Sequence, residues 1–392
     1  MKHKWPLVLF IIAVAAFFRL QNITLAPPGF DTTPLNFTGN WPLIYRVLSA
    51  LAGTLTVLGV YFLTTRLFNW KIAAVASYLM AIAFWHVNFS RMGTGVIAAP
   101  LFLVWGLYYF WRGLSSIKLS NFAISGILLG LGLYTNASFW LTLVILLLTL
   151  LAYWSAIEKV FTHEKYEHVR NKIAAGLAIF AIVLVFTATP SIVRFSLQPL
   201  NMTGSNSVFT AEQPINSFGN NIVKTLAMFN FVGDNNWKNN LAGQPILLWP
   251  VGVLFVLGFI RMIFKFFAAL RKHGHFGAVP TLMLSWFFIG LVPQLFYRTG
   301  VPDSLSALIM APAVFILAGE GLWWIIDKLG DWWQAHDVHE FSIHHHWMKE
   351  SSIMAIFALV VLLASFTITE YDKYFNQWSK NPNVIKVFTQ TK

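Results

Sequence analysis

The sequence predicts an all-α protein, a polytopic bundle of transmembrane helices with about 11 spans and short helices in the loops of its outer face. Two observations lead to this prediction. Of the 392 residues, 57% are hydrophobic and 11% are charged, whereas about a quarter of the residues of a soluble domain are charged. Apolar runs that approach the roughly 20 residues needed to cross a bilayer recur along the chain. Backbone amides inside a bilayer must be bonded internally, which favours helices.

Each span is placed on an apolar run between helix breakers. The first run, WPLVLFIIAVAAFF, begins at Trp5 and is followed by Pro27 and Pro28. It lacks a small-residue cleavage site, so we interpret it as a signal anchor rather than a cleaved signal peptide. The other spans are expected to begin near Ile44, Ile72, Val96, Phe122, Leu141, Ile173, Leu247, Val279, Leu305 and Ile353.

Positive charges predict the orientation. With Lys2 and Lys4 in the cytoplasm, the basic clusters of the later loops also fall inside. These clusters are Arg66 and Lys71; Arg112 and Lys118; Lys159, Lys165, Arg170 and Lys172; Arg261, Lys265, Arg271 and Lys272; Lys328 and Lys349. We therefore expect a multi-pass protein of the plasma (inner) membrane, with one membrane domain over 1–368. Its long outer loop covers about 190–245, and a short extracytoplasmic tail covers 369–392.

Composition also excludes several classes of function. The chain has no cysteine, so disulfides and thiolate metal sites are excluded. The net charge of +12 is scattered between apolar segments, which is typical of topology signals and contacts with membrane lipids rather than of nucleic-acid binding. The segment AHDVHEFSIHHHW contains five histidines. We favour a solvated cytoplasmic loop over a metal site there, because the His-Glu-x-x-His spacing is missing. The histidines are His336, His339, His344, His345 and His346.

Six acids are expected at the outer face, and an outward-facing reaction needs its general base from this set unless it uses His86. The six are Asp31, Glu212, Asp234, Asp303, Glu370 and Asp372. Asp31 follows a stiff Pro-Pro and a glycine directly after a span, which holds its carboxylate near the membrane surface. That position suits a lipid-linked substrate. The alternative is that Asp31 begins a turn or caps a helix.

Two further segments carry candidate binding residues. In FWHVNFSRMG, His86, Asn88 and Arg91 lie at the outer end of a span, where an arginine suits a phosphate. The alternative for Arg91 is snorkelling within an aromatic belt. In MFNFVGDNNWKNN, acid, amide, aromatic and basic side chains are packed together as in a carbohydrate or headgroup site, although turn chemistry explains them almost as well. The candidates there are Asp234, Asn235, Trp237 and Lys238.

A set of segments, in order, resembles bacterial membrane glycosyltransferases of the protein-mannosyltransferase-like family 39. They are PPGFD, LSALAGTLTVLGVYFLTTRLF, WHVNFSRMGTGVIAAPLFLVWGLYYFWRGL, GILLGLGLYTNASF, LAMFNFVGDNNWKNNLAGQP and GVPDSLSALIMAPAVFILAGEGLWW. The resemblance implies the C-type glycosyltransferase fold. It also implies transfer of a sugar from a polyprenyl-phosphate donor to an acceptor at the outer face, with inversion.

By this resemblance, Asp31 matches the catalytic aspartate of the first loop, which acts as the base. Arg91 matches a basic residue near the donor pocket, and Asp234 and Trp237 match a motif of the long loop. Further cations expected to assist at the phosphate are Arg19, Arg46 and Arg298, and Asp303 is a further substrate-binding candidate. The resemblance implies no required cofactor, and it does not decide whether a divalent metal takes part. The acceptor is a lipid, a glycan or a protein.

Three positions depart from the family pattern. Thr32 follows Asp31 where relatives carry a second acid, and Trp140 and Ser306 stand where relatives are expected to have arginine. They favour an alternative, a catalytically degenerate relative that binds a lipid-linked sugar or a partner. A transporter or lipid flippase is a further alternative, for which Glu320 is the one plausible acid within a span.

Overall fold

A computed structural model describes residues 4–28, 41–161, 166–197, 214–273, 276–336 and 344–389. Over these ranges the chain is helical and forms no strand. The helices are α1 (Trp5–Leu20), α2 (Trp41–Leu67), α3 (Trp70–Ile82), α4 (Phe84–Arg91), α5 (Ala98–Ser116), α6 (Leu119–Gly132), α7 (Thr142–Phe161), α8 (Glu167–Leu197), α9 (Pro214–Ala227), α10 (Trp249–His273), α11 (Ala278–Leu295), α12 (Ala311–His336), α13 (His344–Asp372) and α14 (Pro382–Thr389). Short 3₁₀ or π-helical segments are η2 (Gly95–Ile97), η3 (Ala137–Leu141), η6 (Ser306–Met310) and η7 (Lys373–Trp378).

A helix covers each predicted span. Three helices begin away from their predicted starts: α8 at Glu167 rather than Ile173, α12 at Ala311 rather than Leu305, and α13 at His344 rather than Ile353. The other spans begin within about three residues of the prediction. In the described ranges, seven helices are long and apolar enough to cross a membrane, and an eighth span results if α3 and α4 are counted as one bent span. The helices α1 and α6 are apolar but shorter. The described ranges are therefore those of an all-helical, multi-pass membrane protein.

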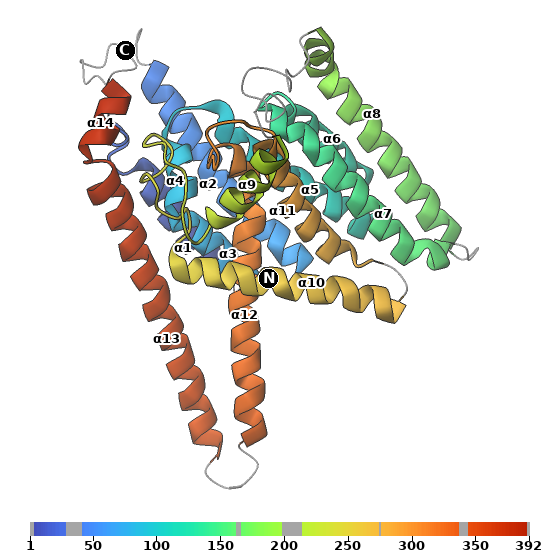
Figure 1. Cartoon of the computed structure of the whole chain (residues 1–392). Helices are drawn as coiled ribbons and strands as arrows, with labels where there is room; N and C mark the ends of the chain where they lie inside the picture. Colours follow the sequence, from blue (N-terminus) through green and yellow to red (C-terminus); the bar gives the residue numbers. More distant parts are fainter. Residues whose placement is uncertain are drawn as a thin grey trace.

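The polar loops of the bundle gather at one end, which we call the loop end. It is at the top of Figure 1 and carries the turn after α1, the α9–α10 loop (228–248), the α11–η6 loop (296–305) and α14. At the opposite end, α12 and α13 extend beyond the other helices. The residues predicted to bind substrate therefore come from segments that meet at one end of the molecule.

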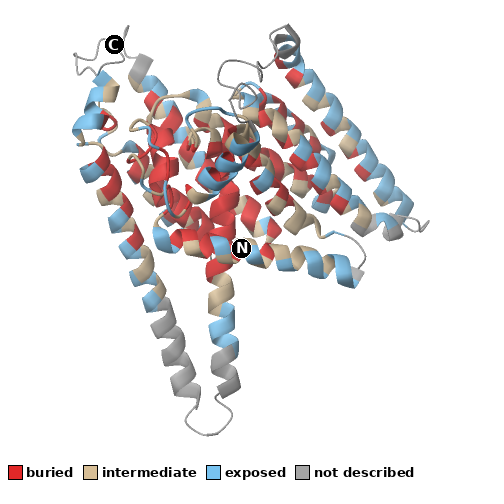
Figure 2. Ribbon diagram, viewed as in Figure 1, coloured by how far each residue is buried: buried red, intermediate tan, exposed pale blue. Residues whose placement is uncertain are grey.

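Buried residues gather in the upper half of the bundle, toward the loop end (Figure 2). Every residue of α4 is buried, as is the whole of 307–322 at the start of the α12 span. Farther along α12, residues 327–331 are exposed. The core thus lies directly beneath the loop end and supports its loops.

The crossing of α10 and α12 depends on two glycines. A Cβ added to Gly258 would lie 1.8 Å from the backbone oxygen of Leu317, and one added to Gly321 would lie 2.0 Å from the backbone oxygen of Leu254. Small residues let helix backbones approach this closely in a membrane bundle. The contact positions the start of the α12 span, which carries the α11–η6 loop.

Candidate active site

A bend of 56° separates α3 from α4 and frees backbone groups that other helices satisfy. The guanidinium of Arg19 on α1 donates to the carbonyl oxygens of Ala81 at 2.8 Å and Met80 at 3.3 Å. The amide of Phe84 donates to the carboxylate of Glu370 on α13 at 2.9 Å. Inserted side chains of this kind are a known cause of helix breaks. They fix the direction in which α4 leaves α3.

Arg91 at the end of α4 is fully buried. Its guanidinium donates to the carbonyl oxygens of Phe18 at 2.8 Å, Gln21 at 2.6 Å and Ala26 at 2.8 Å. It also lies 5.2 Å from the ring centroid of Tyr374. In this arrangement Arg91 holds the end of α1 and its turn, and it does not snorkel. A phosphate contact would compete with these carbonyls, and the predicted donor role stays a prediction.

His86 and Asn88, also on α4, serve the framework of the site. The Nδ1 of His86 lies 2.7 Å from a guanidinium nitrogen of Arg19, and since arginine is a donor only, Nδ1 is the acceptor. The amide nitrogen of Asn88 donates to the backbone oxygens of Lys238 at 3.2 Å and Asn239 at 2.9 Å. Asn88 thereby attaches the α9–α10 loop to the core.

A second contact attaches the other loop. The indole of Trp85 donates to the backbone oxygen of Ser304 at 2.8 Å. Because α4 is buried and rigidly placed, it holds the α9–α10 and α11–η6 loops beside each other.

Two carboxylates meet where these loops join. Asp234 accepts from the amide of Ser304 at 3.0 Å and from its hydroxyl at 2.8 Å. The side-chain amide of Asn239 reaches Asp234 at 3.2 Å and Asp303 at 3.4 Å. The hydroxyl of Ser306 donates to Asp303 at 2.5 Å. Within the described ranges, neither acid forms an ion pair with lysine or arginine.

Both acids line a cavity of about 610 Å³ at the loop end. Its lining is rich in carboxylate, amide and hydroxyl groups: Asp234, Asn235, Asn236, Asn239, Tyr297, Thr299, Gly300, Val301, Pro302, Asp303 and Leu305. Burial raises the pKa of the Asp303 carboxyl above its ordinary value; the hydroxyl of Ser306 opposes this shift, and the charge of Asp234 adds to it. The cavity therefore offers an acid pair held by neutral donors, an arrangement suited to hydroxyl-rich ligands.

The other predicted residues differ in their position relative to this cavity. Asn235 lines it, and Arg298 is exposed between two lining residues, Tyr297 and Thr299. Arg46 is buried and donates to the backbone oxygen of Ile23 at 3.0 Å.

Trp237 and Lys238 face the carboxyl-terminal segment. The backbone oxygen of Trp237 accepts from the indole of Trp378 at 2.8 Å, and the Lys238 amine lies 5.9 Å from the ring centroid of Phe388. Asp31 and Glu212 lie outside the described residues.

The carboxyl-terminal segment supports the site in a way that sequence analysis missed. Beyond the Glu370 contact, Lys373 donates to the backbone oxygen of Pro245 at 3.0 Å, and Tyr374 and Trp378 are buried against Phe84. The signal in the sequence was the spacing of Tyr371, Tyr374, Phe375 and Trp378, which is that of an apolar helix face. Residues 369–378 thus pack against α4 and the α9–α10 loop.

In the part of the chain that is described, no three His, Cys, Asp or Glu residues lie close enough to hold a metal ion together. His339 and the side chains of the other four predicted histidines lie outside that part.

Comparisons with known proteins agree with the architecture. The model of the family described as dolichyl-phosphate-mannose-protein mannosyltransferase matches residues 35–189. No curated protein matches the chain in sequence. The chain is similar to the oligosaccharyltransferase of Archaeoglobus fulgidus tethered with an acceptor peptide, with a TM-score of 0.53 and 13% identity over 95% of this chain and 56% of that one. It is also similar to the same organism's AglB in complex with an inhibitory peptide and a dolichol-phosphate, with a TM-score of 0.50 and 12% identity over 99% and 56%.

The chain spans a little more than half the length of these neighbours. At this low identity, the likeness to these structures shows the fold alone. The match to the family model covers residues 35–189. The resemblance stated from the sequence is confirmed by the model of this family, which matches residues 35–189, and the chain has the C-type glycosyltransferase fold.

Proposed function

We propose that the protein is a membrane glycosyltransferase that moves a sugar from a polyprenyl-phosphate-linked donor to an acceptor, with inversion. The observation that carries the proposal is the cavity at the loop end, where Asp234 and Asp303 lie beside the side-chain amides of asparagines. The chain around this cavity has the C-type glycosyltransferase fold. The charge pattern supports a location of this end on the outer face of the plasma membrane, with the amino end in the cytoplasm.

In the proposed reaction, Asp31 takes the proton of an acceptor hydroxyl as that oxygen bonds to the anomeric carbon of the sugar. The bond from the anomeric carbon to the phosphate oxygen breaks on the opposite side, which inverts the configuration, and polyprenyl phosphate leaves. A cation stabilises the charge that develops on the phosphate. Of the four predicted cations Arg19, Arg46, Arg91 and Arg298, Arg298 is the one exposed beside the cavity.

The role of the cavity is to hold sugar hydroxyls. A carboxylate accepts hydrogen bonds from hydroxyl groups, and such charge-assisted bonds are among the stronger ones. Asn235 and Asn239 add amide groups that both donate and accept. The AglB structure contains dolichol-phosphate and an inhibitory peptide, which supports a lipid-phosphate-linked donor for this chain. The acceptor is a lipid, glycan or protein that presents a nucleophilic group at the same face.

The test is sugar transfer from radiolabelled polyprenyl-phosphate sugars, measured in membranes against a panel of acceptors. Asp31→Asn is expected to lower kcat by about 10²–10⁴-fold, the usual contribution of a general base. Asp303→Asn is expected to raise KM by roughly tenfold or more, because hydrogen bonds to charged groups contribute about 1.5–3 kcal/mol. The matched control is Asp372→Asn at the same end, whose carboxylate contacts Asn376 and Gln377. Full activity of Asp31→Asn would reject the assigned base.

A second candidate function is binding of a lipid-linked sugar without transfer. It is favoured by Ser306, which stands where an arginine is expected and contacts Asp303 through a neutral hydroxyl. Donor binding without turnover across the whole panel, in a chain carrying Ser306→Arg as well as in the wild type, would support this candidate and reject the enzyme.

A further inference from the structure

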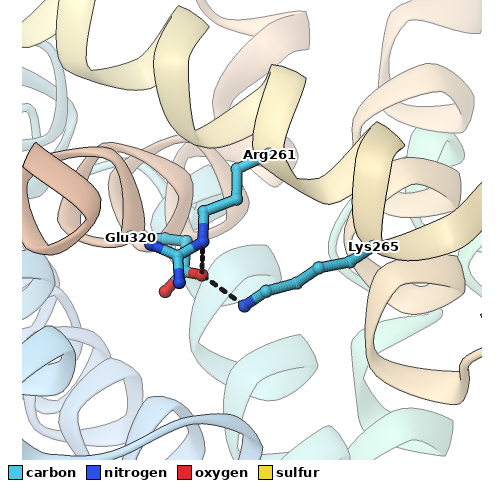
Figure 3. Close-up of polar contacts among 3 residues, drawn as sticks. All are labelled: Arg261, Lys265 and Glu320. Carbon is cyan, nitrogen blue, oxygen red and sulfur yellow. Dashed lines mark hydrogen bonds and ion pairs between the residues drawn. The ribbon is translucent and has the colours of Figure 1, made fainter. Parts of the chain in front are cut away.

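A second charged cluster lies between α10 and α12, away from the loop end. Glu320 on α12 is 1% exposed, and one of its oxygens, Oε1, lies 3.2 Å from Nε of Arg261 and 2.5 Å from Nζ of Lys265. Figure 3 shows both cationic side chains coming from α10, one turn apart, and reaching toward the same carboxylate. Two cations therefore share one anion.

The cluster lies at the end of the bundle that the charge pattern predicts to face the cytoplasm. The amine of Lys265 is 5.5 Å from the ring centroid of Phe68, and Phe68 is in the short turn between α2 and α3. Arg261 and Lys265 are 23% and 40% exposed. Both side chains are therefore accessible from the surface of the molecule.

The cluster has one positive charge in excess. Among the described residues, Nη1 of Arg261 and Oε2 of Glu320 are buried and have no hydrogen-bond partner. A desolvated charge or donor without a partner is costly. An anionic oxygen beside the exposed part of the Arg261 side chain would balance the excess charge.

A cavity of about 420 Å³ begins at Arg261. It is lined by Arg261, Trp324, Ile326, Asp327, Lys328, Gly330 and Asp331. Of its two acids, Asp331 is paired with Lys328 at 3.2 Å, so Asp327 is the group that a bound anion has to avoid. The Arg261 side of the cavity is the favourable place for such an anion.

The flank of this site is apolar. On α10, Ile260, Phe264 and Phe267 are 38%, 67% and 60% exposed and lie on the helix surface next to Arg261 and Lys265. In a multi-pass protein such residues contact acyl chains. We propose that the α10–α12 site binds the phosphate group of an anionic lipid of the cytoplasmic leaflet, with the acyl chains against this apolar stripe. Basic pockets between transmembrane helices at this leaflet are suited to such headgroups.

The test uses the full chain in nanodiscs of phosphatidylcholine with or without phosphatidylglycerol. Retained lipid is measured by native mass spectrometry and stability by thermal unfolding. Phosphatidylglycerol is expected to be retained and to raise the unfolding temperature. Arg261→Gln and Lys265→Gln are each expected to weaken retention roughly fivefold, since a cation near the leaflet surface contributes about 1 kcal/mol. The control, Arg112→Gln near the end of α5, is expected to retain the lipid as the wild type does.

Glu320→Gln separates lipid binding from a purely structural role. It raises the excess charge, so it is expected to strengthen phosphatidylglycerol retention even where it lowers the unfolding temperature in phosphatidylcholine. Equal retention by the wild type, Arg261→Gln and Glu320→Gln would overturn the proposal. Displacement of the lipid by free glycerol phosphate at similar concentration would also overturn it, because the source of the phosphate would then be a soluble anion.

Discussion

The acids of the cavity are stabilised by hydroxyl and amide donors rather than by cations. Burial of Asp303, together with the nearby charge of Asp234, raises the pKa of the Asp303 carboxyl. The folded state therefore holds this proton to higher pH than the unfolded state does. The stability that this provides is present below the ordinary carboxyl pKa and is lost as pH rises through the raised value. The ionised carboxylate accepts hydrogen bonds from hydroxyl groups more strongly than the protonated form does, so binding is expected to strengthen over that same rise in pH.

Asp234→Asn is expected to shift the pH dependence of KM. In the wild type, KM is expected to rise as pH falls, because Asp303 becomes protonated. Removing the charge of Asp234 lowers the pKa of Asp303, so this rise in KM is expected to begin at a lower pH. The measurement is KM for the sugar donor as a function of pH between about 3 and 8, a range that includes the reference carboxyl values and extends above them. In Asp303→Asn, the rise in KM at low pH should disappear. An identical rise in the wild type and both variants would show that Asp303 does not control binding.

The sequence could predict some of these residues and not others. Asp234, Asn235 and Asp303 were expected at one face because each is a polar residue of an outer loop. Their pairing through Asn239 and Ser304 joins residues far apart in the chain, and one sequence carries no signal for such a contact. Arg91 was expected beside a phosphate, but its guanidinium satisfies carbonyls freed where α1 ends, which local sequence does not show.

Among the elements, α4 depends most on distant contacts. The run from Trp70 to Arg91 has no proline or glycine, so one continuous span was expected and the break at Ala83 was not. The break is held by Arg19 of α1 and Glu370 of α13. Long apolar helices could be predicted from composition and periodicity, whereas the bend could not, since its causes lie on two other helices.

Glu370→Gln is expected to weaken the junction of α4. The variant keeps the size of the side chain but replaces a charged acceptor of the Phe84 amide by a neutral one, which should lower the free energy of unfolding by about 1–3 kcal/mol. Thermal unfolding in one detergent measures this. Glu158→Gln, an exposed position on α7, is the control and should unfold as the wild type does. If both variants unfold alike, Glu370 does not hold α4.

The whole molecule is organised by close helix packing that brings the loops to one end. Composition predicted a bundle of helices, and every predicted span is helical. The projection of α12 and α13 beyond the other helices (Figure 1) was not predicted. Apolar runs in a sequence predict where helices form, but they do not predict how far one helix extends beyond its neighbours. The glycines of the α10–α12 crossing are likewise recognised only when the helix axes are known.

Gly321→Ala is expected to separate α12 from α10. Its Cβ would meet a backbone oxygen that cannot move aside, and overpacking of this kind costs about 1–3 kcal/mol. Because α12 carries the α11–η6 loop, KM should rise as well. Gly330→Ala on the same helix is the control, since no atom lies within 4 Å of its added Cβ. Unfolding temperature and KM for both variants check the prediction, and equal values would contradict it.

The most direct test of the account is a structure of the protein with a polyprenyl-phosphate sugar bound. We expect a hydroxyl of the transferred sugar to lie within about 3.2 Å, the limit of a good hydrogen bond, of the carboxylate of Asp303 or Asp234. A bound donor whose sugar lies outside this cavity, with neither carboxylate in contact with it, would show that the cavity is not the sugar site.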